Sequence, residues 1–163
     1  MKKLLLTSVL AVVFILASWS ASANQPVKIE ASVKQIATDF EKTDGVDCIV
    51  VEDGVSLTII KQLFKQKFGK DFMKGVTSMV IIDYSKASNE TYTAIRKRID
   101  AYSATLQVFN IPDAGDIKCF ASVNNSNETA NISNLMVLIE NSENRLFVYM
   151  GGVINIDKLD LQL

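Results

Sequence analysis

The C-terminal part of the chain contains four short runs of β-branched, aromatic and other apolar residues, separated by turn-forming residues. We expect four strands here, over residues 106–110, 117–123, 135–140 and 145–150. The connections at 112–115 and 141–144 are short, which is typical of antiparallel neighbours. This part of the chain is therefore predicted to form an antiparallel meander, with residues 124–134 as a longer polar loop.

The preceding part alternates helices with strands. Apolar residues recur at helical spacing in three segments, over 31–42, from Ser56 to Gly69, and over 90–104. Two apolar runs, 46–52 and 77–83, are predicted to be strands buried on both faces. Because a helix separates them, we expect a parallel pair with a right-handed crossover. The predicted fold class is α+β. It is a mixed sheet of about six strands with a parallel βαβ start, an antiparallel meander, and helices packed mainly on one face.

The first 23 residues have the pattern of a signal peptide. A basic start, Met1 to Lys3, precedes an apolar run of about fourteen residues, and Ala21-Ser22-Ala23 suits signal peptidase. That run is shorter than the ~20 residues of a membrane span, and no cysteine for a lipid anchor follows it. We expect cleavage near Asn24, one domain over 24–163, no stable membrane insertion, and export to the periplasm or the medium.

The composition excludes several classes of function. Residues 24–163 carry fifteen basic and eighteen acidic side chains, a net charge of −3 that gives no reason to expect nucleic acid as a partner. The whole chain has no histidine. This chain alone therefore cannot build a Ser-His-Asp or Cys-His site, or an imidazole metal site. No catalytic residue and no cofactor is predicted.

Three carboxylates are the best candidates for a ligand site. Glu52 and Asp53 end the first predicted strand, and Asp83 ends the second. If those strands were parallel neighbours, the carboxylates would gather at the edge where open α/β sheets bind ligands, and they would suit Mg²⁺ or Ca²⁺. The interpretation that we favour is that they are solvated turn residues.

The two cysteines, Cys48 and Cys119, lie in separate predicted strands. Export would allow a disulfide between them, and the large loop that it closed would add stability. The alternative, which we favour, is a pair of reduced thiols buried as small apolar side chains.

Five lysines follow one another on and after the second predicted helix, at positions 61, 65, 67, 70 and 74. They could meet an anionic surface. We favour an ordinary solvated helix face, since the domain is net acidic.

The layout resembles a known group of proteins. Phe40-Glu41-Lys42 ends a helix, Gly45-Val46 enters a strand, and a VIID strand, an LMVLIE strand and an RLFVYMGG strand follow before a leucine-rich tail. Over residues 40–163 this resembles small exported Bacteroidetes proteins that are grouped in domain-of-unknown-function families. The resemblance implies no activity and no catalytic residue. Because some members lie near genes for extracytoplasmic sigma factors, it also implies a regulatory partner in envelope stress.

The predicted function is a non-enzymatic binding or interaction domain in the bacterial envelope, whose partner is a protein or another envelope component. The alternatives are a histidine-free, metal-assisted enzyme and the envelope-stress partner. An enzyme should show a concave pocket with converging carboxylates, whereas a binding domain should show an exposed apolar patch or an unpaired strand edge. The predicted buried core consists of Phe40, Val50, Leu63, Phe64, Ile81, Ile95, Ile99, Cys119, Val137 and Val148.

Overall fold

A computed structural model describes residues 29–52, 54–68, 73–110, 116–126 and 129–155. Its elements are α2 (Ile29–Phe40), β1 (Asp47–Val51), α3 (Val55–Phe68), β2 (Val76–Asp83), α4 (Asn89–Ser103), β3 (Gln107–Asn110), β4 (Ile117–Ser126), β5 (Thr129–Glu140) and β6 (Arg145–Asn155). The predicted order of helices and strands is confirmed. The predicted signal peptide, residues 1–23, lies outside the described residues. None of the helices that the structure describes is long and apolar enough to cross a membrane.

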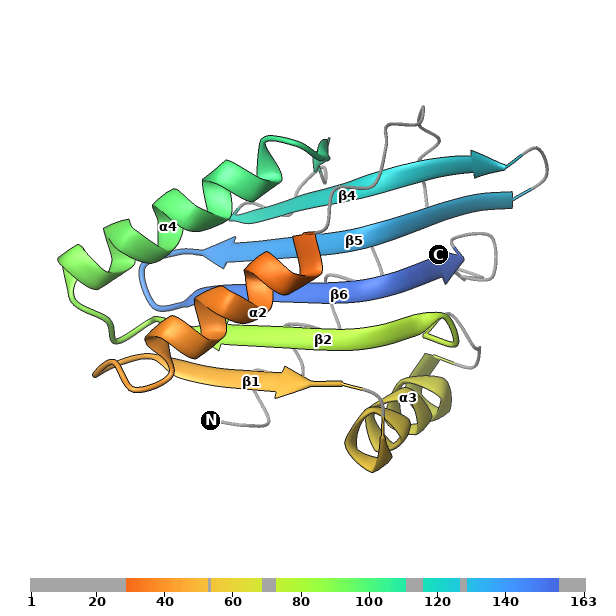
Figure 1. The fold of residues 1–163 in the computed structure, drawn as a ribbon, viewed down its shortest axis with the longest axis horizontal. Helices are drawn as coiled ribbons and strands as arrows, with labels where there is room; N and C mark the ends of the chain where they lie inside the picture. Colours follow the sequence, from red (N-terminus) through yellow and green to blue (C-terminus); the bar gives the residue numbers. More distant parts are fainter. Residues whose placement is uncertain (1–28, 53, 69–72, 111–115, 127–128, 156–163) are drawn as a thin grey trace.

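The strands form one sheet in the order β1-β2-β6-β5-β4-β3, and every pair of neighbours is antiparallel (Figure 1). The predicted meander of the last four strands is confirmed. The predicted parallel start is wrong, because β1 pairs with β2 in antiparallel register, with Asp47 opposite Asp83. Helices α2 and α4 lie on one face of the sheet, whereas α3, which connects β1 to β2, lies at one end of these two strands and reverses the chain (Figure 1).

The predicted polar loop at 124–134 is also wrong. Strands β4 and β5 continue through it as a hairpin, from Ser122 opposite Ser133 to Ser126 opposite Thr129. Its asparagines and serines lack the apolar alternation that marks a strand in the sequence. Backbone pairing with both β4 and β6 nevertheless extends β5 through this segment. The register between β5 and β6 shifts near Asn134, which has a positive φ of 51°.

A hydrophobic core lies between one face of the sheet and the helices α2 and α4 (Figure 1). Ser88 caps α4, since its hydroxyl accepts a hydrogen bond from the Thr91 amide. Both helices turn an apolar stripe to the sheet, and the central strands meet them with large side chains. The buried members of this core are Ile29, Val33, Ile36, Ala37, Val46, Val80, Ile82, Tyr84, Ile95, Ile99, Met136, Leu138, Phe147 and Tyr149.

Six of the ten predicted core residues are buried, and two, Val50 and Leu63, are exposed. Buried as predicted are Ile81, Ile95, Ile99, Cys119, Val137 and Val148. Phe40 is half-buried, and the side chain of Phe64 is outside the description. Val50 in β1 is 44% exposed and Leu63 in α3 is 48% exposed, so both were wrongly placed in the core. Strand β1 is an edge strand, and the prediction that it is buried on both faces is wrong.

Candidate functional site

The predicted acidic rim is not assembled in this fold. Glu52 follows the end of β1, whereas Asp83 lies opposite Asp47 at the other end of that strand. Along β1, Asp47 and Glu52 are five residues apart, which corresponds to about 17 Å in an extended strand. Asp53 lies outside the described residues. Among the residues that are described, no three Asp, Glu or Cys side chains form a group that could hold a metal ion.

Each of the two described rim carboxylates has a local structural partner. Lys34 of α2 places its Nζ 2.9 Å from Glu52, which ties the helix to the end of β1. Asp83 accepts a hydrogen bond from the Ser85 amide at 3.0 Å, in an Asx turn that ends β2. These contacts agree with the interpretation of the carboxylates as turn residues.

The cysteines are both free thiols. They lie in β1 and β4, which are separated by three other strands, a distance of about 19 Å at the usual strand spacing. A disulfide needs Cα atoms within about 7 Å, so this fold does not allow a bridge between Cys48 and Cys119. Burial raises the pKa of the Cys119 thiol to about 12. Burial, with Glu41 and Asp47 nearby, raises that of Cys48 to about 11. Neither thiol is activated as a nucleophile.

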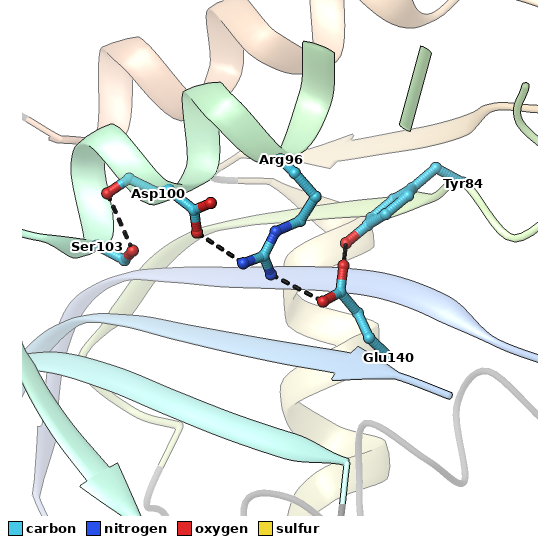
Figure 2. A network of polar contacts seen from close by, with 5 residues as sticks. All are labelled: Tyr84, Arg96, Asp100, Ser103 and Glu140. Carbon is cyan, nitrogen blue, oxygen red and sulfur yellow. Dashed lines mark hydrogen bonds and ion pairs between the residues drawn. The ribbon is translucent and has the colours of Figure 1, made fainter. Parts of the chain in front are cut away.

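A polar cluster connects α4 to the sheet, and Figure 2 shows its members facing one another. The Tyr84 hydroxyl donates to Glu140 Oε1 at 2.8 Å, and Arg96 Nη1 donates to Glu140 Oε2 at 2.9 Å. The second Arg96 nitrogen, Nη2, reaches Asp100 Oδ1 at 2.7 Å. Sequence reasoning missed this cluster, because its members are distant in the chain and fit no motif.

The electrostatics of the cluster indicate a structural role. Burial, together with the Glu140 carboxylate, raises the pKa of Tyr84, so its hydroxyl stays protonated and donates. Arg96 and Glu140 neutralise each other, with side chains only 18% and 22% exposed. Each oxygen of the Glu140 carboxylate accepts a hydrogen bond from a side chain, Oε1 from Tyr84 and Oε2 from Arg96. The cluster therefore holds α4 against the ends of β2 and β5.

A second polar group lies under the start of α2. The Ser78 hydroxyl of β2 is buried and makes no well-aligned hydrogen bond, yet it lies close enough to the Glu30 carboxylate to help lower its pKa. The larger cause of that lowered pKa is the hydrogen bond from Lys34. Opposite Ser78 stands Gly151, where a Cβ atom would lie 2.3 Å from the Ser78 hydroxyl oxygen. The glycine thus gives the serine and the glutamate room against the backbone of β6.

The most distinctive exposed surface is apolar, and it lies along β1 and α3. In β1, Ile49 and Val50 are 46% and 44% exposed. In α3, Val55, Ile59 and Leu63 follow at a spacing of four residues and form one stripe, exposed by 77%, 54% and 48%. Leu57 points to the other side of α3 and is buried. We call these five exposed residues the β1–α3 edge.

The two ends of β1 differ in charge. Next to its N-terminal end, the acidic side chains are Glu41, Asp44, Asp47 and Asp83, and the lysines are Lys42 and Lys86. At its C-terminal end, Lys34 forms ion pairs with both Glu52 and Glu30, and the described part of α3 and its exit contribute Lys61, Lys65 and Lys74. Lys61 Nζ lies 3.4 Å from the Lys74 carbonyl oxygen, which keeps this basic group together. Among the residues that the structure describes, acidic side chains therefore outnumber lysines at one end of β1, and lysines outnumber acidic side chains at the other.

Comparison with known proteins does not assign the chain to a class. No protein-family model, no curated protein and no solved structure matches it. The resemblance to small exported Bacteroidetes proteins therefore stays a prediction from the sequence.

Sequence reasoning missed the β1–α3 edge because it assigned Val50 and Leu63 to the core and interpreted residues 46–52 as a strand buried on both faces. One signal was available in the sequence. Val55, Ile59 and Leu63 form a stripe distinct from the one that begins at Leu57 and Ile60, so α3 has more apolar surface than one contact can bury.

Proposed function

We propose that this chain is a non-catalytic protein-binding domain that acts outside the cytoplasm, and that it binds its partner through the β1–α3 edge. The observation that carries the proposal is the exposure of five large aliphatic side chains on an edge strand and the adjoining helix. The location rests on the N-terminal pattern of the sequence alone.

Both parts of this surface are features that isolated proteins normally suppress. An edge strand presents unpaired backbone N–H and C=O groups, and proteins usually protect such edges with lysine, proline or a bulge. The five residues of β1, DCIVV, include no lysine and no proline, and their register with β2 is regular; Asp47 at one end is the single charged side chain of the strand. Exposed apolar side chains lie beside this edge, with Ile49 and Val50 on opposite faces of the strand and a further stripe on α3. Such side chains next to an unpaired edge are typical of an interaction site. Edge pairing would supply backbone hydrogen bonds and the α3 stripe would supply apolar contact.

Affinity capture with matched variants tests this proposal. The tagged chain, expressed in its own bacterium with its N-terminal segment in place, is compared with Ile59→Lys and with Val108→Lys. Ile59 lies in the α3 stripe, whereas Val108 is equally exposed, at 57%, on the opposite edge strand β3. We expect a protein that co-purifies with the wild type and with Val108→Lys but is lost with Ile59→Lys. Capture that is unchanged by Ile59→Lys would refute the proposed surface.

A further inference from the structure

We infer that the occupant of the β1–α3 edge is a second copy of this chain, paired antiparallel along β1 so that two six-stranded sheets become one continuous sheet. This inference rests on the proposed function, because it names the partner for the same surface. Three properties of the surface carry it: its location on an edge strand, a register free of clashing charges, and a charge pattern that complements itself.

The register follows from the length of β1. A two-fold axis that passes beside Ile49 pairs each of the five residues of β1 with a residue of the other copy. Ile49 then faces its own counterpart, and Asp47 faces Val51, so no two like charges stand directly opposite each other. Cys48 faces Val50, which brings together two side chains on the face of the sheet that carries α2.

The charges complement each other under the same operation. Antiparallel pairing places the C-terminal end of one β1 beside the N-terminal end of the other. The lysines of α3 and its exit, Lys61, Lys65 and Lys74, therefore approach the end of the other copy where Glu41, Asp44 and Asp47 outnumber Lys42. Because the operation is two-fold, this attraction occurs twice. A parallel arrangement of two β1 strands would instead bring like ends together.

The apolar side chains gain cover from the same arrangement. Ile49 and Val50 are half exposed, and among the strands that the structure describes β1 has a neighbour on one side only. A second β1 would supply the missing neighbour at the strand spacing of about 4.8 Å. The α3 stripe lies at the end of the strand, where it would extend the contact beyond the paired backbones.

The oligomeric state is measured by sedimentation equilibrium on the purified chain, expressed with its own N-terminal segment and isolated in the form that the cell produces. We expect a wild-type dimer, a dimer for Val108→Lys, and a monomer for Ile49→Lys. Melting curves of the two variants verify that both are folded. A monomeric wild type, or a dimer that persists in Ile49→Lys, would overturn the inference.

Two further variants test the register and the charges. In a Cys48→Ala background, Ile49→Cys should form a disulfide-linked dimer under air, since directly opposed residues of an antiparallel pair have Cα atoms within disulfide range, whereas Val108→Cys should not. Lys61→Glu together with Lys65→Glu should weaken the dimer on the order of tenfold, and Asp44→Lys with Asp47→Lys added should recover part of that loss. A dimer with no cross-link at position 49 and no response to charge reversal would exclude the two-fold arrangement.

The outcomes separate this inference from the proposed function. If the chain is a monomer but captures another protein that Ile59→Lys loses, the proposed function stands and the second copy is refuted as the occupant. If the chain is a monomer and captures nothing that depends on the edge, both fail.

Discussion

Strands β1 and β2 are hydrogen-bonded neighbours with similar apolar sequences, DCIVV and VTSMVIID, yet their environments are opposite. In β2, Met79 to Ile82 are all buried, because β1 and β6 flank this strand. In β1, Ile49 and Val50 are about half exposed, and β2 is the one strand paired with β1 in the described part of the chain. An apolar run therefore specifies a strand but not its place in the sheet, and an apolar run at an edge leaves large side chains exposed.

The largest expected effect is a difference in stability between these two strands. Ile82→Ala should lower the unfolding free energy by about 2–5 kcal/mol, because Ile82 is fully buried and truncation leaves a cavity. Ile49→Ala, on the edge, should cost less than about 1 kcal/mol in the monomer. Urea unfolding at a protein concentration too low for association measures both. Equal losses at the two positions would break the contrast between interior and edge.

A second contrast concerns ion pairs, one half-buried and one exposed. Glu140→Gln removes the carboxylate that Tyr84 and Arg96 share and leaves the Arg96 charge partly unpaired, so we expect a loss of about 1–3 kcal/mol. The matched change is Asp39→Asn. It removes the partner of Arg98, whose Nη1 lies 2.6 Å from Asp39 Oδ2 on an exposed helix surface. Thermal unfolding should separate the two variants, with Asp39→Asn close to wild type. A larger shift for Asp39→Asn would show that the cluster of Figure 2 is not what holds α4 in place.

The sequence predicted the elements well and their arrangement less well. Local periodicity identified α2, α4 and β2 to within a few residues, because a helix or strand buried on a face must repeat its apolar residues. The direction of β1 could not be predicted in the same way. A connection through α3 is long enough for a parallel or an antiparallel return, and no local pattern in the sequence distinguishes the two. The error propagated to the site, since Glu52 and Asp83 meet only in the parallel arrangement.

The polar segment between Val123 and Asn134 shows a second limit. Its strands are continued by backbone pairing, in which every residue can take part, whereas the prediction depended on side-chain alternation. The β1–α3 edge shows a third limit of prediction from the sequence. Whether an apolar side chain is buried or exposed depends on which strand lies next to it, and the local sequence does not indicate that neighbour.

A smaller effect compares the two thiols at high pH. Burial holds the pKa of Cys119 at about 12 and that of the edge cysteine, Cys48, at about 11, above the ordinary thiol value of 9.0. Because the folded state retains a proton that the unfolded state releases, this contribution to stability is complete below pH 9 and is lost as the pH rises toward these values. We expect the unfolding free energy to fall between pH 8 and pH 10, and to fall less in Cys119→Ala. An unfolding free energy that rises over this range would contradict the sign of both shifts.

The smallest expected effect is the response to divalent cations. Glu52 and Asp83 lie at opposite ends of β1, so they cannot share an ion, and Asp83 already accepts a hydrogen bond from the Ser85 amide. A ligand that binds only the folded state must raise its stability, so millimolar Mg²⁺ or Ca²⁺ should leave the melting temperature unchanged. Asp83→Asn keeps an oxygen that can accept the Ser85 hydrogen bond, and it should melt like the wild type with or without the cation. A cation-dependent rise that Asp83→Asn abolishes would place a ligand site at the end of β2, and the edge of β1 would then no longer be the leading functional surface.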